Sequence, residues 1–66
     1  MILNGRPADI PAGETVASVL SRLGLEPDAR GVAVAIDGEV LPRARWSTFA
    51  LAEDARVEVL TAMQGG

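Results

Sequence analysis

The chain closes with the stretch RVEVLTAMQGG, residues 56–66, in which an alternating segment runs into two glycines. Val57 and Val59 alternate with charged neighbours, and this period of two predicts a strand with one buried face. Glycine has no Cβ, so Gly65 and Gly66 form a thread that fits a channel too narrow for a side chain. The stretch therefore predicts a sheet strand followed by an extension whose chemistry resides in a terminal carboxylate.

The N-terminal residues predict a first hairpin. Asn4-Gly5 is a dipeptide that favours a type I′ turn, because both central residues of that turn need positive φ. We expect it to join a strand at residues 1–3 to a second arm at residues 6–10. Pro7 removes a ladder donor, so this second arm is predicted at the edge of the sheet.

A second hairpin is predicted in the middle of the chain. Residues 31–36 alternate branched residues with alanines, which gives a strand one large-residue face and one thin face that can accept a close neighbour. Asp37-Gly38 favours another type I′ turn. Residues 39–41 then form the return strand.

A helix is expected after Thr15, whose hydroxyl can accept from an unpaired amide of the first turn. Its apolar residues follow helical spacing and are predicted to form one buried stripe: Val16, Val19, Leu20 and Leu23. Its water-facing side is expected to carry Ser18, Ser21 and Arg22. Gly24 fits a left-handed C-cap, and Pro27 prevents the helix from continuing.

The segment 43–51 lacks a clean period. We interpret it as a turn with a short 3₁₀ piece that lays Trp46, Phe49 and Leu51 over one end of the core. Trp46 is interpreted as a packing residue more readily than as a recognition residue, since a small core needs its volume. A further turn at residues 53–54 leads into the last strand.

The element order is strand-strand-helix-strand-strand-strand, which predicts an α+β fold. One helix packed across one face of a mixed sheet of four to five strands buries the apolar residues with the fewest layers. The first and last strands are expected to pair in parallel, joined through a crossover. This is a β-grasp, or ubiquitin-like, arrangement, with residues 1–63 as the domain and residues 64–66 as a flexible Gly-Gly tail.

Composition excludes several classes of function. The chain has 66 residues, a formal net charge of −3 and neither cysteine nor histidine. Zinc and redox-metal sites lack their usual ligands, and nucleic acid is an unfavourable partner without a basic face. No apolar run approaches the roughly 18 to 20 residues of a membrane span, and no signal peptide is recognised at the N-terminus. We expect a cytoplasmic protein.

The partner-facing residues are expected around the last strand and the tail. Leu60 points away from the buried valines, so it either contacts a partner or covers an edge of the core. Met63 and Gln64 lie in the approach to the terminal glycines, and Met63 offers a deformable apolar side chain. Arg43, with its neighbour Arg45, either pairs with an acidic partner surface or stays solvated. Asp37 and Glu39, on a hairpin without a pocket, do not make an acid-base pair.

In this order and length, several short motifs resemble the ThiS family of sulfur carrier proteins in thiamine biosynthesis. The resemblance covers the whole chain. Its motifs are AGETV at 12–16, VAIDGEV at 34–40, VLPR at 40–43 followed by Trp46, and QGG at 64–66. Each motif is weak alone, and together they fit this family better than the small subunit of molybdopterin synthase.

The resemblance implies a co-substrate rather than an enzyme. In the family, an ATP-using, E1-like adenylyltransferase of the ThiF type adenylates the terminal glycine, here Gly66. Sulfur that a cysteine desulfurase system takes from cysteine then yields a thiocarboxylate, which a ThiG-type thiazole synthase uses to build the thiazole ring. Gly65 provides access to the narrow groove of the partner. No cofactor is expected on this chain, since ATP is used by the partner.

Three other functions stay open at the level of sequence. A molybdopterin-type carrier would use the same chemistry and deliver sulfur to another synthase. A ubiquitin-like modifier would be joined through the carboxylate of Gly66 to amines of target proteins. A plain interaction module would leave its terminus unmodified.

Overall fold

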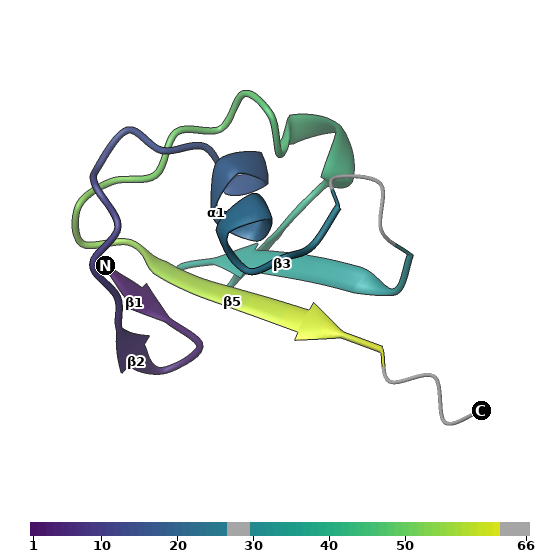
Figure 1. Cartoon of the computed structure of the whole chain (residues 1–66), viewed down its shortest axis with the longest axis horizontal. Helices are drawn as coiled ribbons and strands as arrows, with labels where there is room; N and C mark the ends of the chain where they lie inside the picture. Colours follow the sequence, from purple (N-terminus) through teal and green to yellow (C-terminus); the bar gives the residue numbers. More distant parts are fainter. Residues whose placement is uncertain (27–29, 63–66) are drawn as a thin grey trace.

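The computed structural model describes residues 1–26 and 30–62, which form a five-stranded mixed sheet with one α-helix against one face (Figure 1). The strands are β1 (Ile2–Leu3), β2 (Arg6–Pro7), β3 (Val32–Ile36), β4 (Glu39–Leu41) and β5 (Arg56–Thr61). The helix is α1 (Val16–Arg22), and a 3₁₀ turn, η1 (Arg43–Arg45), follows β4. The predicted β-grasp order of elements is confirmed.

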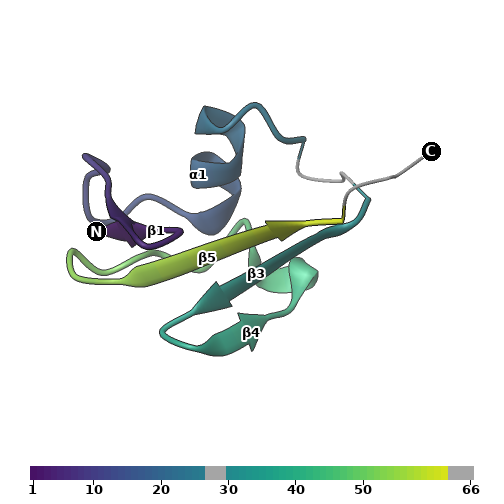
Figure 2. The same cartoon turned by 90° about the horizontal axis from the view of Figure 1, so that it is seen from below.

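The central strand of the sheet is β5. The strand order is β2-β1-β5-β3-β4, with β5 parallel to β1 and antiparallel to β3. Figure 2 shows β5 between β1 and β3, with β4 outermost. The crossover that a parallel pair requires contains α1, which lies across the sheet. The parallel pairing of the first and last strands is therefore as predicted.

The first hairpin has the expected turn and a shorter second arm. Asn4 has φ 51° and Gly5 has φ 82°, both in the left-handed region that a type I′ turn requires. The prediction of a second arm to residue 10 is wrong, because β2 ends at Pro7, which lacks a ladder donor. One further bond, from Ala8 N–H to the Met1 carbonyl, closes the pair at 2.9 Å. Ile10 packs against the core instead of extending the strand.

The second hairpin matches its prediction. Asp37 has φ 51° and Gly38 has φ 87°. The register pairs Val34 with Leu41 on one side and with Val59 on the other. These three side chains are buried and belong to the same core cluster as the apolar residues of α1.

The helix begins as predicted and buries a narrower stripe. The Thr15 hydroxyl accepts from Ser18 N–H at 3.1 Å, which satisfies one of the free amides of the first turn. Leu23, expected in the buried stripe, is 43% exposed and caps the helix. Gly24, at φ 79°, reverses the chain, so Leu25 N–H donates to the Leu20 carbonyl in a Schellman turn. Leu25 then packs against the core in place of Leu23.

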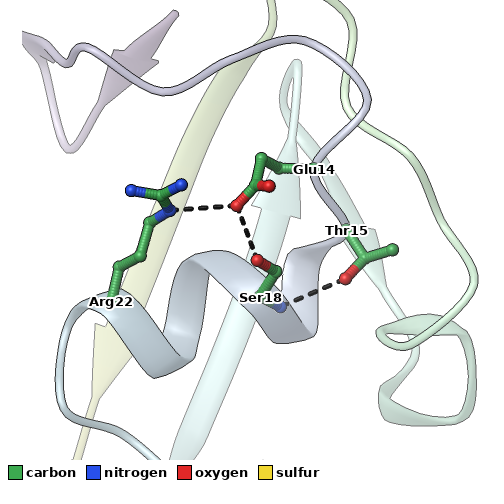
Figure 3. Close-up of polar contacts among 4 residues, drawn as sticks. All are labelled: Glu14, Thr15, Ser18 and Arg22. Carbon is green, nitrogen blue, oxygen red and sulfur yellow. Dashed lines mark hydrogen bonds and ion pairs between the residues drawn. The ribbon is translucent and has the colours of Figure 1, made fainter.

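A polar cluster of Glu14, Ser18 and Arg22 runs along α1, from the residue before its N-cap to its last residue (Figure 3). One oxygen of Glu14, Oε1, accepts from Ser18 Oγ at 2.6 Å and from Arg22 Nε at 2.9 Å. Ser18 is half-buried by this contact rather than facing water, which corrects the expectation from spacing. The hydrogen bond from Ser18, and then the bond and charge of Arg22, lower the pKa of the Glu14 carboxyl below its usual value of 4.5.

We expect Glu14→Gln to remove a pH-dependent part of the stability. A carboxyl with a lowered folded pKa contributes stability that is present above its unfolded pKa and lost as pH falls through its folded pKa. Unfolding free energies from pH 7 to pH 2 should show wild type above Glu14→Gln at neutral pH, with the difference closing below about 4.5. The effect should be small because water screens this half-exposed pair. A difference that is constant over the whole range would contradict the assignment.

The core lies between α1 and the sheet. The described residues with buried apolar side chains are Val16, Val19, Leu20, Val34, Leu41, Trp46, Leu51, Ala55, Val57 and Val59. Trp46 is 3% exposed, and its indole N–H donates to the Leu41 carbonyl at 3.1 Å. Trp46 is therefore a packing residue, as predicted. It follows directly after η1, so this 3₁₀ turn places its side chain over the core.

Candidate functional site

The candidate site begins where β5 ends. Ala62 N–H donates to the Gly31 carbonyl at 2.6 Å, so the β3–β5 ladder continues one bond beyond Thr61. The strand thus holds the chain firmly up to the last described residue. The site residues predicted after it, Met63, Gln64, Gly65 and Gly66, lie outside the described residues. The boundary predicted between domain and tail falls there as well.

The face of the sheet opposite α1 carries exposed apolar residues. Leu60 is 61% exposed, which agrees with its predicted outward direction. Val40, in β4, is 76% exposed and was not singled out from the sequence. The alternation of side chains along a strand could have revealed Val40. Because Leu41 is buried, the preceding residue must face the other side of the sheet.

Two small residues of β3 lie between these apolar side chains. The register pairs Ala33 with Leu60, and it pairs Ala35 with both Val40 and Glu58. We refer to Ala33, Ala35, Val40 and Leu60 as the uncovered face. The alanine side of β3, predicted to be thin, is therefore the side that no helix covers. Next to it, β5 runs through Leu60 toward residue 62.

Arg43 is placed away from Leu60 in the fold. It lies on η1, and its guanidinium carbon stands 4.5 Å from the centre of the Trp46 ring. Arg45 similarly stands 5.6 Å from the centre of the Phe49 ring. Arginines stacked on aromatic rings help to cover the core, and they also present charge to solvent. Arg43 thus stays a candidate contact residue on a different part of the surface.

Asn4 makes a contact with β5 that was missed from the sequence. Its backbone N–H donates to the Val57 carbonyl at 2.8 Å, and its side-chain Oδ1 accepts from Val59 N–H at 2.8 Å. In a parallel ladder a single residue makes both bonds with its main chain. Because the chain turns at Gly5, the Asn4 side chain replaces the carbonyl in the second bond. Asp37 does the same at the other turn, where Oδ1 accepts from Arg56 N–H at 3.0 Å.

Asn4→Gly should destabilise the domain by about 1 kcal/mol, the usual worth of one such hydrogen bond. Glycine tolerates the positive φ, so the loss reports the contact with Val59 rather than the turn. Amide hydrogen exchange should become faster at Val59 and stay unchanged at Val34. Asn4→Asp keeps an acceptor and serves as the control, so equal destabilisation by Asp and Gly would count against this role.

The described residues contain little that could perform chemistry. Within 1–26 and 30–62, no three acidic, histidine or cysteine side chains come together as a metal site would require. Asp37 is engaged with the backbone of Arg56 rather than facing Glu39 as a catalytic partner. No helix in this part of the chain has the length and apolar character of a membrane span. The uncovered face stays exposed and is continuous with the strand that leads to the C-terminal residues.

Comparison with protein families gives a match to the model of the ThiS family over residues 1–66. A comparison with curated protein sequences gives no match. The family match spans the tail as well as the domain, so it includes the predicted site residues.

Two solved structures from Geobacter metallireducens are similar to this chain. One is a crystal structure of thiamine biosynthesis protein ThiS, with 31% identity and a TM-score of 0.75, covering 98% of this chain and 96% of that one. The other is an NMR solution structure of a thiamine biosynthesis protein, with 32% identity and a TM-score of 0.75, covering 98% of this chain and 85% of that one. Both agree with the fold described above.

Proposed function

The chain belongs to the ThiS family of sulfur carriers in thiamine biosynthesis, and from this premise we propose that its cargo is a thiocarboxylate on Gly66. The observation that carries the proposal is the family match over residues 1–66, which extends through the terminal glycines. In this role the protein is a co-substrate that partner enzymes act on. It supplies the reacting carboxylate and the surface by which those enzymes recognise it.

The proposed chemistry starts with activation. An α-carboxylate has a pKa of about 3.3 to 3.7, so it is ionised at neutral pH and is a poor electrophile. An adenylyltransferase of the ThiF type joins the carboxylate of Gly66 to the AMP part of ATP, and pyrophosphate leaves. The acyl carbon then bears a good leaving group, and sulfur can displace AMP.

The sulfur comes from outside the chain, because the sequence contains no cysteine. A cysteine desulfurase system is the proposed source. Its persulfide sulfur displaces AMP to give an acyl disulfide on Gly66, and a thiol such as free cysteine then reduces the S–S bond to release the thiocarboxylate. A thiazole synthase of the ThiG type then takes the sulfur for the thiazole ring. Gly65 and Gly66 serve access, since a Cβ at either position would widen the thread that enters the partner.

The uncovered face is the proposed docking surface for these enzymes. Exposed apolar groups gathered on one face are typical of sites where a partner removes water from both surfaces. Glu58 lies on the same face, opposite Ala35. Leu60 lies two residues before Ala62, so a partner seated on the face is close to the residues that follow it. Met63, Gln64 and Arg43 are further candidate contacts.

The experiment that tests activation is ATP–pyrophosphate exchange with a purified ThiF-type adenylyltransferase. Wild-type protein should support exchange that depends on the carrier, on ATP and on a free C-terminal carboxylate. A C-terminally amidated chain, prepared by ligation, is the control because it has the same fold and no carboxylate at Gly66. Equal exchange with the amidated chain would refute Gly66 as the adenylation site.

A further inference from the structure

Gly31 differs from the other glycines at positive φ in the described part of the chain. It has φ +72°, and a Cβ added to it would lie 3.1 Å from the Ala62 Cβ. The other four have nothing within 4 Å of such an atom: Gly5, Gly13, Gly24 and Gly38. Those four serve turns and caps, whereas Gly31 also allows another segment to approach closely.

The segment that approaches Gly31 is the end of β5. Besides the Cβ, Ala62 places its backbone N and O 3.7 Å from the position of the added atom. Ala62 N–H also donates to the Gly31 carbonyl at 2.6 Å. Gly31 therefore has two roles: its carbonyl accepts the last hydrogen bond of the ladder, and its lack of a side chain leaves room for the Ala62 side chain. Contacts as short as 3.1 Å require the neighbour to move by a few tenths of an ångström.

We propose that Gly31 is a positioning residue for the sulfur carrier reaction, because it fixes the place and direction in which the chain leaves β5 at Ala62. This proposal rests on the proposed function and deepens it. This last fixed point sets where the tail starts, and so how far and in which direction the tail must reach toward a partner docked on the uncovered face. A side chain at position 31 would displace that point while the docking face stays intact.

The expected cost follows from the geometry of reacting groups. A misplacement of about 1 Å far from the chemistry can lower a rate about 100-fold, and a few tenths of an ångström lowers it less. We therefore expect Gly31→Ala to reduce kcat/KM for thiocarboxylate formation by about 3- to 10-fold. Because the docking face is unchanged, the reduction should appear mainly in kcat.

Gly38→Ala is the matched control. Gly38 also has positive φ, +87°, and it follows the other end of β3, but an added Cβ there meets nothing within 4 Å. Both variants put alanine in a strained conformation and should lower the Tm, Gly31→Ala somewhat more because Ala62 must also shift. Rates are therefore compared at a temperature at which both variants are fully folded. Only Gly31→Ala should lower kcat, which separates positioning from a general loss of stability.

A double variant removes the contact in a second way. Gly31→Ala combined with Ala62→Gly deletes the Cβ that position 31 would meet, so kcat should return to the value of Ala62→Gly alone. Such a recovery is an interaction energy between the two positions, which independent structural effects would not produce. A double variant no more active than Gly31→Ala would overturn the proposal.

Amide hydrogen exchange tests the same contact without any partner enzyme. Gly31→Ala should speed exchange at Ala62 N–H and leave Val34 and Val59 unchanged, whereas Gly38→Ala should not affect Ala62. If wild type gains no thiocarboxylate, the proposed function fails and this measurement still tests the contact. If wild type is thiolated and Gly31→Ala reacts like Gly38→Ala, the positioning role alone is wrong.

Discussion

Gly65→Val should abolish thiocarboxylate formation while leaving the fold intact. The valine adds a branched side chain one residue before the reacting carboxylate, which obstructs a narrow groove and restricts the extended backbone. We expect no thiocarboxylate above background after incubation with ATP, cysteine, a desulfurase and the adenylating partner. Gly65→Ala, with a single added carbon, should react at an intermediate rate.

The fold of these tail variants is checked separately. Every side chain in the buried core identified here belongs to residue 59 or earlier, so thermal unfolding should be the same as in wild type. A chain extended by one residue beyond Gly66 should fail for a different reason, because its carboxylate is displaced by a whole residue. Normal thiolation of either Gly65→Val or the extended chain would refute the access role of the glycines.

Leu60→Glu should lower kcat/KM for thiocarboxylate formation by at least about 10-fold. Burial of a leucine side chain against a partner contributes about 1.5 to 3 kcal/mol, and each 1.4 kcal/mol is tenfold. Glutamate loses this contribution and adds a second negative charge beside Glu58, which lies on the same side of β5. Leu60 is 61% exposed in the free protein, so the Tm should change little. The effect should appear mainly in KM.

Ser21→Glu is the matched control for Leu60→Glu. It makes the same change in net charge at an exposed position on α1, which covers the opposite side of the sheet. We expect activity close to wild type. If both variants lose activity equally, charge repulsion accounts for the loss and the uncovered face is not the docking surface. If Leu60→Glu is fully active, Leu60 makes no contact that matters to the reaction.

Local chemistry made much of the fold predictable. Asn4-Gly5 and Asp37-Gly38 favour one turn type strongly enough to fix both hairpins, and the alternation of Val57 and Val59 fixed the face of β5. Pairing the first and last strands needed only the element order and the crossover rule. These signals act within a few residues or follow from topology, which is why sequence carries them.

The errors came from residues whose place depends on tertiary contacts. Leu23 has helical spacing, but the helix ends before it and the Schellman turn sends Leu25 to the core instead. The side chain of Asn4 reaches Val59, which is 55 positions away along the chain. Spacing cannot reveal such a partner, because the contact exists only once β1 and β5 are side by side.

Some residues of the candidate site could likewise be predicted from the sequence, and others became evident only from tertiary contacts. Leu60 was found because alternation assigns its face, whereas Val40 became evident only with the register of β4 against β3. Gly31 could not be recognised from sequence, since its special feature is the distance to Ala62 rather than its own conformation. The role of Gly66 came from resemblance to a family, because a terminal Gly-Gly alone does not specify a reaction.

High-resolution mass spectrometry of the C-terminal peptide tests the central claim most directly. The protein is incubated with ATP, cysteine, a desulfurase and a ThiF-type adenylyltransferase, and thiol-selective alkylation marks a thiocarboxylate. Fragmentation must place the sulfur on Gly66. Replacing a carboxyl oxygen by sulfur raises the mass by nearly the same amount as oxidising a methionine to its sulfoxide. Our account predicts an alkylated sulfur on Gly66 that appears only when ATP is present. An unmodified Gly66, with the same enzymes active on another carrier, would contradict it.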